Sequence, residues 1–164
     1  MSSLLRPLSL PTSAPTVAFA CLGLFATCFA VPARAAIDES IPTAASLAQL
    51  EDRASHANPR EQCFLYTELV HTMTELAGKQ ISAGDTDQAA STLKQVNQYA
   101  HLIQVSLARN TKRLKDAQEL MHHTTYRLAQ FLHLVSDDDR KNVQQTLKQL
   151  DQVNDQLLTQ VFQH

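Results

Sequence analysis

Part of this sequence occurs twice, and the two copies keep the same internal order. The motif Glu-Leu-Val-His at 68–71 returns as Glu-Leu-Met-His at 119–122, and Thr follows three residues after each copy. The motif Thr-Leu-Lys-Gln occurs at 92–95 and again at 146–149. The gap between the two motifs is three residues longer in the second copy. Because self-similarity constrains architecture strongly, we expect a duplicated helical hairpin with a length change in its turn.

Capping signals mark where the first long helix begins and ends. Asn58 can cap a helix, Pro59 is tolerated at its first position, and Glu61 completes a capping box. Gly84 suits the left-handed position that follows a helix, so we expect this helix to run to about residue 82.

Two more helix starts are visible further along the chain. Asp85, with Gln three residues later, resembles a second capping box. Ser-Asp-Asp-Asp at 136–139 marks the start of the last helix, because Ser or Asp can cap and acidic residues favour a helix N-terminus.

The junction between the two repeats allows two interpretations. Leu107, Asn110 and Leu114 continue the three- and four-residue rhythm, which favours one helix over 86–135. Asn and Thr at 109–111 can instead cap a tight turn, and a turn there would fold the hairpins into a compact four-helix bundle. The sequence does not decide between these alternatives.

Apolar residues recur at helical steps in every predicted long helix, and no strand signal occurs. We therefore expect an all-α, antiparallel helical bundle of two duplicated hairpins, at 58–108 and 111–162. A lead-in with one short helix, at 36–57, precedes it. The predicted core stripes are Tyr66, Leu69, Val70, Met73, Leu76, Ala77 and Gln80 or Ile81; Ala89, Leu93, Val96, Ala100, Ile103 and Leu107; Leu114, Ala117, Met121, Thr124, Leu128, Phe131 and Val135; and Val143, Leu147, Leu150, Val153 or Asn154, Leu157 and Val161.

Residues 1–35 have the pattern of a cleaved signal peptide. An apolar run at 17–31 is too short to span a bilayer as a stable helix, and Ala33 and Ala35 provide a signal-peptidase site. We expect an exported protein, periplasmic or extracellular, that has no membrane contact after cleavage. A lipid-anchored form processed at Cys21 is the less favoured alternative.

The charge balance and cysteine content of the remaining chain exclude some functions. Without residues 1–35 the chain has 12 basic and 16 acidic residues, and this mild acidity argues against nucleic-acid binding. Cys63 is then the one cysteine left, so no intramolecular disulfide can form, and we expect it to be a small buried hydrophobe.

The duplicated Glu-x-x-His motif places a carboxylate and an imidazole on one helix face, where both can reach one metal ion. Such pairs resemble the ferritin-like di-metal carboxylate bundles, which also consist of two helical hairpins. That resemblance implies Glu68, His71, Glu119 and His122 as metal ligands. In that family, however, the motif lies on the second helix of each hairpin, whereas here it lies on the first. Helical phase also points these four side chains outward or sideways from the core stripes.

The same outward faces carry aromatic residues beside Glu and His, which can mark a contact surface. The short helix within 44–57 is the first candidate to cover Phe64. The candidate surface residues are Phe64, Glu68, His71, Glu75, Glu119, His122 and Tyr126.

A further resemblance concerns the first hairpin turn. Leu76, Ala77, Gly84, Ala89 and Leu93 fit the turn of a tetratricopeptide repeat, which implies a helical interaction module. We expect an exported, non-catalytic scaffold that binds another protein or itself and needs no cofactor. A metal-binding bundle that uses the Glu-x-x-His pairs is the alternative.

Overall fold

A computed structural model describes residues 42–107 and 111–163, and all of its regular structure is helical. In chain order the helices are α1 (Ala44–His56), α2 (Pro59–Ala83), α3 (Thr86–Leu107), α4 (Leu114–Phe131) and α5 (Asp137–Gln163). The prediction of an all-α helical bundle is confirmed. The predicted signal peptide at 1–35 lies outside the described residues.

Local capping forms the helix ends that the sequence predicts. The Asn58 side chain accepts a hydrogen bond from the backbone N–H of Arg60 at 3.0 Å, and Pro59 is the first helical residue. Gly84 ends α2 with a φ of 82°, which non-glycine residues rarely adopt, and its N–H bonds back to the carbonyls of Gln80 and Ile81. Ser136 caps α5 through a 3.3 Å bond from the Asp139 N–H.

The junction between the repeats is a break, so the interpretation as one helix over 86–135 is wrong. α3 ends at Leu107 and α4 begins at Leu114. Two contacts hold the chain after the break. The Thr111 hydroxyl donates to the Ser106 carbonyl at 3.2 Å, and the Lys112 N–H donates to the Arg60 carbonyl at 2.7 Å. These bonds tie the start of α4 to the end of α3 and to the start of α2.

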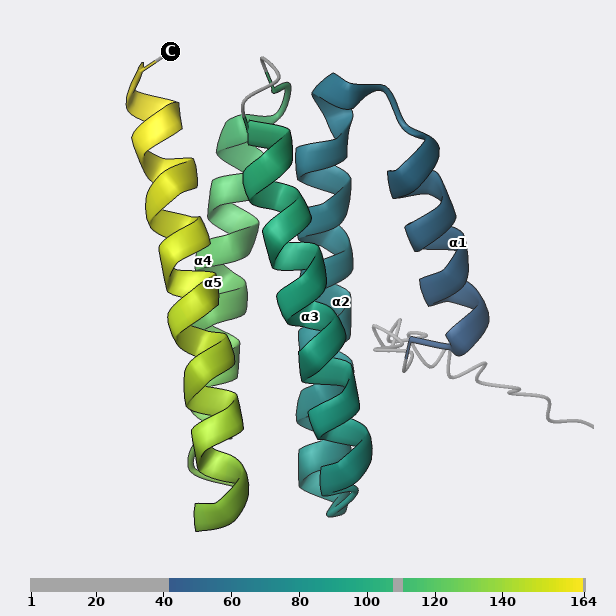
Figure 1. Ribbon diagram of the computed structural model, residues 1–164, viewed down its shortest axis with the longest axis vertical. Coiled ribbons are helices and arrows are strands. Elements are labelled where there is room, and N and C mark those ends of the chain that lie inside the picture. The colour runs from purple at the N-terminus through teal and green to yellow at the C-terminus, as the bar shows by residue number, and fades with distance from the viewer. Residues whose placement is uncertain (1–41, 108–110, 164) are drawn as a thin grey trace, which may run out of the picture. The chain divides into compact units, whose positions relative to one another are not determined.

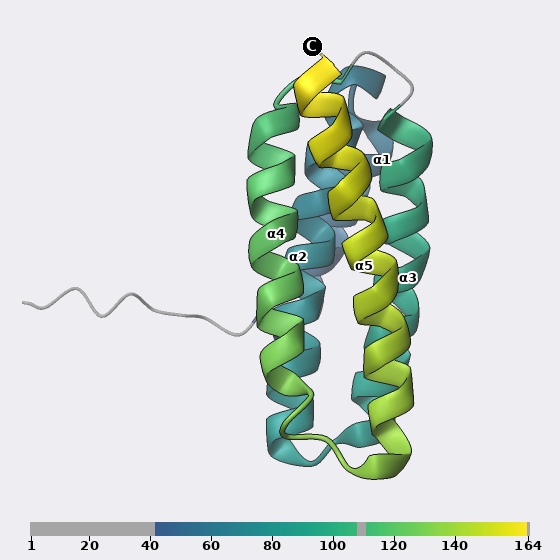
Figure 2. The ribbon, with the colours of Figure 1, turned by 90° about the vertical axis from the view of Figure 1, so that its left-hand side faces the viewer.

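The helices α2, α3, α5 and α4 form a ring of neighbours (Figure 1). α2 packs against α3 and α4, and α5 packs against the same two helices. The turn after α2 and the turn after α4 lie at the same end of the bundle (Figure 2). The α2–α3 hairpin therefore lies beside the α4–α5 hairpin, with α2 next to α4 and α3 next to α5. α1 packs against α2.

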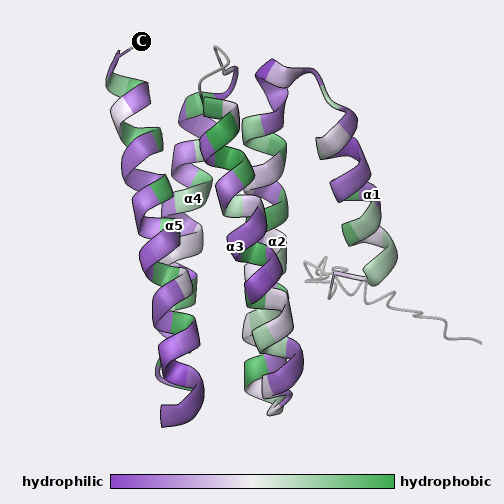
Figure 3. Cartoon of the chain, viewed as in Figure 1, coloured by the Kyte–Doolittle hydropathy of each residue, from purple (hydrophilic) through white to green (hydrophobic). Residues whose placement is uncertain are grey.

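The core lies between the two hairpins and contains most of the predicted stripe residues. The largest fully buried side chains include Leu69, Leu93, Ile103, Met121, Leu128, Leu150 and Leu157. α5 is hydrophilic over much of its surface, with hydrophobic positions spaced along it (Figure 3). Burial of such stripes is the main favourable term that holds helices of this kind together.

Some predicted stripe positions differ from the expectation. α4 ends at Phe131 instead of continuing to Val135, because residues 132–134 form a turn, yet Val135 is still only 7 % exposed. Thr146 is fully buried, whereas Leu147 beside it is half-buried. The predicted stripe residues that are half-buried are Leu76, Leu107, Leu114, Leu147 and Val161. Within the described residues, no helix combines the length and the apolar character that a membrane crossing requires.

Candidate functional site

Both residues of the predicted Glu68–His71 pair lie on α2, but their side chains contact different neighbouring helices. The Glu68 carboxylate accepts a hydrogen bond from Arg53 of α1 at 2.8 Å. Both side chains are well exposed, so this ion pair contributes little to stability. His71 is half-buried and points sideways to α4, where its Nδ1 lies 3.0 Å from the Thr124 hydroxyl oxygen.

The contact with Thr124 favours one of the two tautomers of neutral His71. The Thr124 hydroxyl donates its single hydrogen to the Leu120 carbonyl at 2.7 Å. With that hydrogen so placed, the Thr124 oxygen accepts from Nδ1 of His71, which corresponds to the tautomer with the lone pair on Nε2. The imidazole is oriented by a bond across the α2–α4 interface.

Three more side chains complete what we call the α2–α4 polar cluster: His71, Glu75, His123 and Arg127. The His71 and His123 rings lie 5.4 Å apart between centroids, tilted by 55°. Arg127 binds Glu75 in a bidentate pair, with N–O distances of 2.8 and 2.9 Å. A bidentate guanidinium–carboxylate pair is among the stronger polar contacts in proteins. The cluster lines an open hollow of about 580 Å³, together with Pro42, Thr72 and Lys79.

The surroundings of the cluster shift two pKa values downward. Burial lowers the pKa of His71 below its ordinary value of 6.5, and the His123 and Arg127 charges lower it further, while the Glu75 charge opposes this shift. The hydrogen bond from Arg127 lowers the pKa of Glu75 below its ordinary value of 4.5. At neutral pH His71 is therefore an uncharged group beside a charged pair.

These shifts predict a pH dependence of stability. The folded-state pKa of His71 lies below its unfolded value, so its stabilising contribution is complete above about pH 6.5 and declines as the pH falls through the folded value. We expect urea unfolding at pH 5 to give a lower free energy than at pH 7.5. His71→Gln should flatten this dependence, and His122→Gln should leave it unchanged. An equal slope in all three proteins would contradict the assignment.

The second Glu-x-x-His pair lies on an exposed part of α4. Glu119 is 3.7 Å from Lys115, one turn earlier, and His122 is exposed. Tyr126, one turn further, is 60 % exposed. Glu68, His71, Glu119 and His122 do not come together in one place. In the described part of the chain, no group of three or more His, Cys, Asp and Glu side chains has a geometry for metal binding.

Phe64 is half-buried, and a cation covers one face of its ring. The guanidinium of Arg113 lies 3.5 Å from the ring centroid and is also paired with Asp116 at 2.9 Å. Arg113 has a φ of 56°, the positive value that a non-glycine residue rarely takes. α1 packs against α2 near Phe64, and a hollow lined by Arg53, His56, Ala57, Glu61, Phe64, Leu65, Glu68 and Arg113 lies between them.

The sequence did not identify His123, Arg127 or Arg113 as contact residues. The one available signal was pairing at helical spacing, since His71 and Glu75 are four residues apart and so are His123 and Arg127. That spacing does not indicate which helices are neighbours. For this reason the partners of His71 and Glu75 had to come from the structure.

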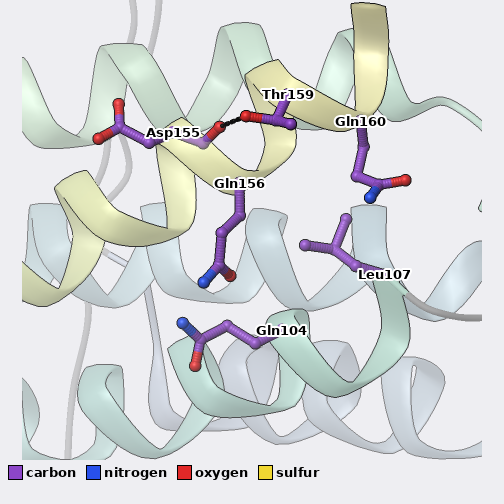
Figure 4. Close-up of a pocket in the computed structure, with 6 residues that line it drawn as sticks. All are labelled: Gln104, Leu107, Asp155, Gln156, Thr159 and Gln160. Carbon is purple, nitrogen blue, oxygen red and sulfur yellow. Dashed lines mark hydrogen bonds between the residues drawn. The ribbon is translucent and has the colours of Figure 1, made fainter. Parts of the chain in front are cut away.

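A groove of about 410 Å³ lies between α3 and α5 (Figure 4). The side-chain amides of Gln104 and Gln156 point toward each other across it, and the Asp155 carboxylate points away from it. The Thr159 hydroxyl donates to the Asp155 carbonyl within α5. The groove presents amides and an aliphatic side chain, Leu107, and no convergent acid, base or nucleophile.

Cys63 is fully buried beside Ser106. Burial raises the pKa of its thiol to about 11, an effect that the Ser106 hydrogen bond partly opposes. A protonated, enclosed thiol is a poor nucleophile, in agreement with the expectation of a small buried hydrophobe.

Comparisons of this chain with protein-family models, with curated proteins and with solved structures find no match.

Proposed function

We propose that this protein is an exported, non-catalytic scaffold that binds another protein or itself through an outer helical face. The observation that carries the proposal is the exposure of large apolar side chains on the second hairpin. Tyr126 on α4 is 60 % exposed, and Leu158 and Phe162 on α5 are 38 % and 82 % exposed. Exposed aromatic and aliphatic side chains on the outer side of two neighbouring helices can mark a protein interaction site.

We further propose that the two antiparallel hairpins are copies of one ancestral unit. Burial follows the repeat that the sequence suggests. Five of the six buried residues of α4 have a buried counterpart 51 positions earlier in α2. Four of the five buried residues of α5 have one 54 positions earlier in α3. The pairs are Ala117 with Tyr66, Met121 with Val70, Thr124 with Met73, Thr125 with Thr74, Leu128 with Ala77, Val143 with Ala89, Thr146 with Thr92, Leu150 with Val96, and Leu157 with Ile103.

Side-by-side hairpins support an interaction role by their architecture. In helical-repeat proteins each hairpin buries one side against the next, and the side of the last hairpin is left for solvent or a partner. The α4–α5 hairpin has this position here, since α1 packs against α2 and the described residues place no helix over the outer side of α4 and α5.

Metal binding by the Glu-x-x-His pairs is an untested prediction, and the separation of the four side chains gives it no support. Elemental analysis of the purified protein tests it directly. Stoichiometric zinc, nickel or iron that is lost in Glu119→Gln and His122→Gln would favour metal binding over the scaffold.

The scaffold proposal is tested by binding. The wild-type protein, immobilised, should retain itself or one saturable partner from an extracytoplasmic fraction. A Tyr126→Ser, Phe162→Ser double variant should retain neither, although its helical circular dichroism should be unchanged. A wild-type protein that stays monomeric and retains nothing would contradict the proposal, and equal retention by the variant would place binding on another surface.

A further inference from the structure

Two histidines from different helices meet at the open hollow of the α2–α4 polar cluster. His71 lies on α2 and His123 on α4, and their ring centroids are 5.4 Å apart. Both residues line the hollow, and His123 is exposed, so a small ion has access to the rings from solvent. The sequence indicated Glu68 as the partner of His71 in metal binding, but the Glu68 carboxylate bonds to Arg53 of α1. In the structure the second imidazole takes that place.

The spacing of the two rings suits imidazoles that share one metal ion. A transition-metal ion lies about 2.0–2.1 Å from a ligating imidazole nitrogen. Two imidazoles that bind one tetrahedral ion at this distance have their ring centroids roughly 5 Å apart. The observed 5.4 Å between His71 and His123 is close to that value. Small changes in the side-chain torsions of the exposed His123 would therefore complete the geometry.

The contact with Thr124 prepares His71 to be a ligand. Metal-ligating histidines almost always donate their other ring N–H to an oxygen atom of the protein, which fixes both the tautomer and the orientation of the ring. The Thr124 hydroxyl oxygen lies 3.0 Å from Nδ1 of His71, and this contact leaves the lone pair on Nε2 for an ion. Thr124 is itself fixed, since it is fully buried and donates to the Leu120 carbonyl.

The polar groups around the hollow favour a cation over an anion. The guanidinium of Arg127 is already bonded to Glu75 and Gln130, and the neutral His71 offers a lone pair instead of an N–H. Glu75 cancels the charge of Arg127, and Lys79, which also lines the hollow, opposes a cation. Among the described residues, no third His, Cys, Asp or Glu side chain completes the ligand set. Water would fill the other positions, so the site would exchange its ion readily.

We propose that His71 and His123 together bind a divalent transition-metal ion, with Cu²⁺ preferred over Ni²⁺ and Zn²⁺. Imidazole suits all three ions, and affinity at a given nitrogen site rises from Ni²⁺ to Cu²⁺ and falls again at Zn²⁺. Mg²⁺ and Ca²⁺ prefer oxygen ligands and should not bind there. This ligand pair joins the two hairpins and differs from the Glu-x-x-His pairs, and the proposal does not depend on the scaffold function.

Calorimetric titration of the purified full chain with Cu²⁺, Ni²⁺ and Zn²⁺ salts, at about pH 7.5 where imidazoles are uncharged, tests the proposal. The wild-type protein should bind a single Cu²⁺ ion most tightly. Loss of an outer-shell partner typically costs about 10–100-fold in affinity, so Thr124→Val should weaken binding by roughly ten-fold. His71→Gln and His123→Gln should each weaken it further. The matched control is His122→Gln, an exposed position beside His123, which should bind as the wild type does.

Electron paramagnetic resonance of the Cu²⁺-loaded protein separates ligation from a structural effect of the substitutions. The wild-type spectrum should show coupling to two imidazole nitrogens, and the His123→Gln spectrum should lose one of them. His123 is exposed, so its replacement leaves the fold intact and keeps the test valid if His71→Gln lowers stability.

Three results would overturn the proposal. They are a wild-type protein that binds none of the three ions, a His123→Gln variant that binds Cu²⁺ as tightly as the wild type, and an equal loss of affinity in His122→Gln. A protein that binds no metal ion but retains a partner protein would overturn this site and leave the proposed scaffold function standing.

Discussion

Replacing Leu157 with Ala is expected to lower the free energy of unfolding by about 2–5 kcal/mol, the range for a leucine removed from a packed core. Leu157 is fully buried in α5, whereas Leu158 beside it is 38 % exposed. Leu158→Ala removes the same atoms and should cost less than about 1 kcal/mol, because a partly exposed site leaves no closed cavity. Urea unfolding of both variants gives the comparison.

The difference between these neighbours tests the orientation of α5. The side chains of consecutive helical residues point about 100° apart. A rotation of α5 by one position would exchange the buried leucine with the exposed one. If Leu158→Ala proved as costly as Leu157→Ala, the orientation of α5 would be wrong and Leu158 would not lie on the outer side of the bundle.

Replacing Gly78 with Ala is expected to destabilise the protein by about 1–3 kcal/mol, although Ala is the better helix former by about 1 kcal/mol. A Cβ atom at Gly78 would overlap the ring of Phe131, so α2 and α4 approach closely only because this residue has no side chain. The ring would have to leave a site in which it is 8 % exposed.

A double variant separates this overlap from any other effect of the substitution. In a Phe131→Ala background the obstacle is gone, so Gly78→Ala should become neutral or slightly stabilising. Thermal or urea unfolding of the four proteins completes the cycle. A cost that is the same in both backgrounds would show that Gly78 does not contact Phe131, and the packing of α2 on α4 would need revision.

Local chemistry explains why the helix ends could be predicted from the sequence. The Asn58 cap, Pro59 at the first position and Gly84 after the last turn act within a few residues, so their meaning does not depend on the rest of the fold. The buried stripes could be predicted for the same reason, since helical periodicity alone selects Val70, Met121 and their neighbours.

Long-range contacts explain why the junction between the repeats could not be predicted. Leu107 and Leu114 keep a helical rhythm across it, and that rhythm is compatible with one helix or with two. The break is held by the bond from Lys112 to Arg60, whose partners are 52 residues apart. A stretch of sequence as long as one helix is too short to contain both partners of that bond.

The candidate site was predictable only in part, because helical phase gives a direction and not a neighbour. Phase placed His71 outward or sideways, and the structure places it sideways against α4. Its partners Thr124 and His123 depend on the two hairpins lying side by side. His122 occupies the same position in the second copy of the motif and is exposed. The histidine of this motif therefore makes a contact inside the bundle in the first copy and lies on the outer surface in the second.

The central claim is that the exposed outer side of α4 and α5, which carries Tyr126, Leu158 and Phe162, is a contact surface, and amide chemical shifts followed during dilution of the isotope-labelled protein test it most directly. The account predicts concentration-dependent shifts concentrated around His122, Tyr126, Leu158 and Phe162. The amides around Val105, an exposed apolar residue on α3, should not change. A spectrum that does not change with concentration, or changes confined to α1 and α3, would contradict it.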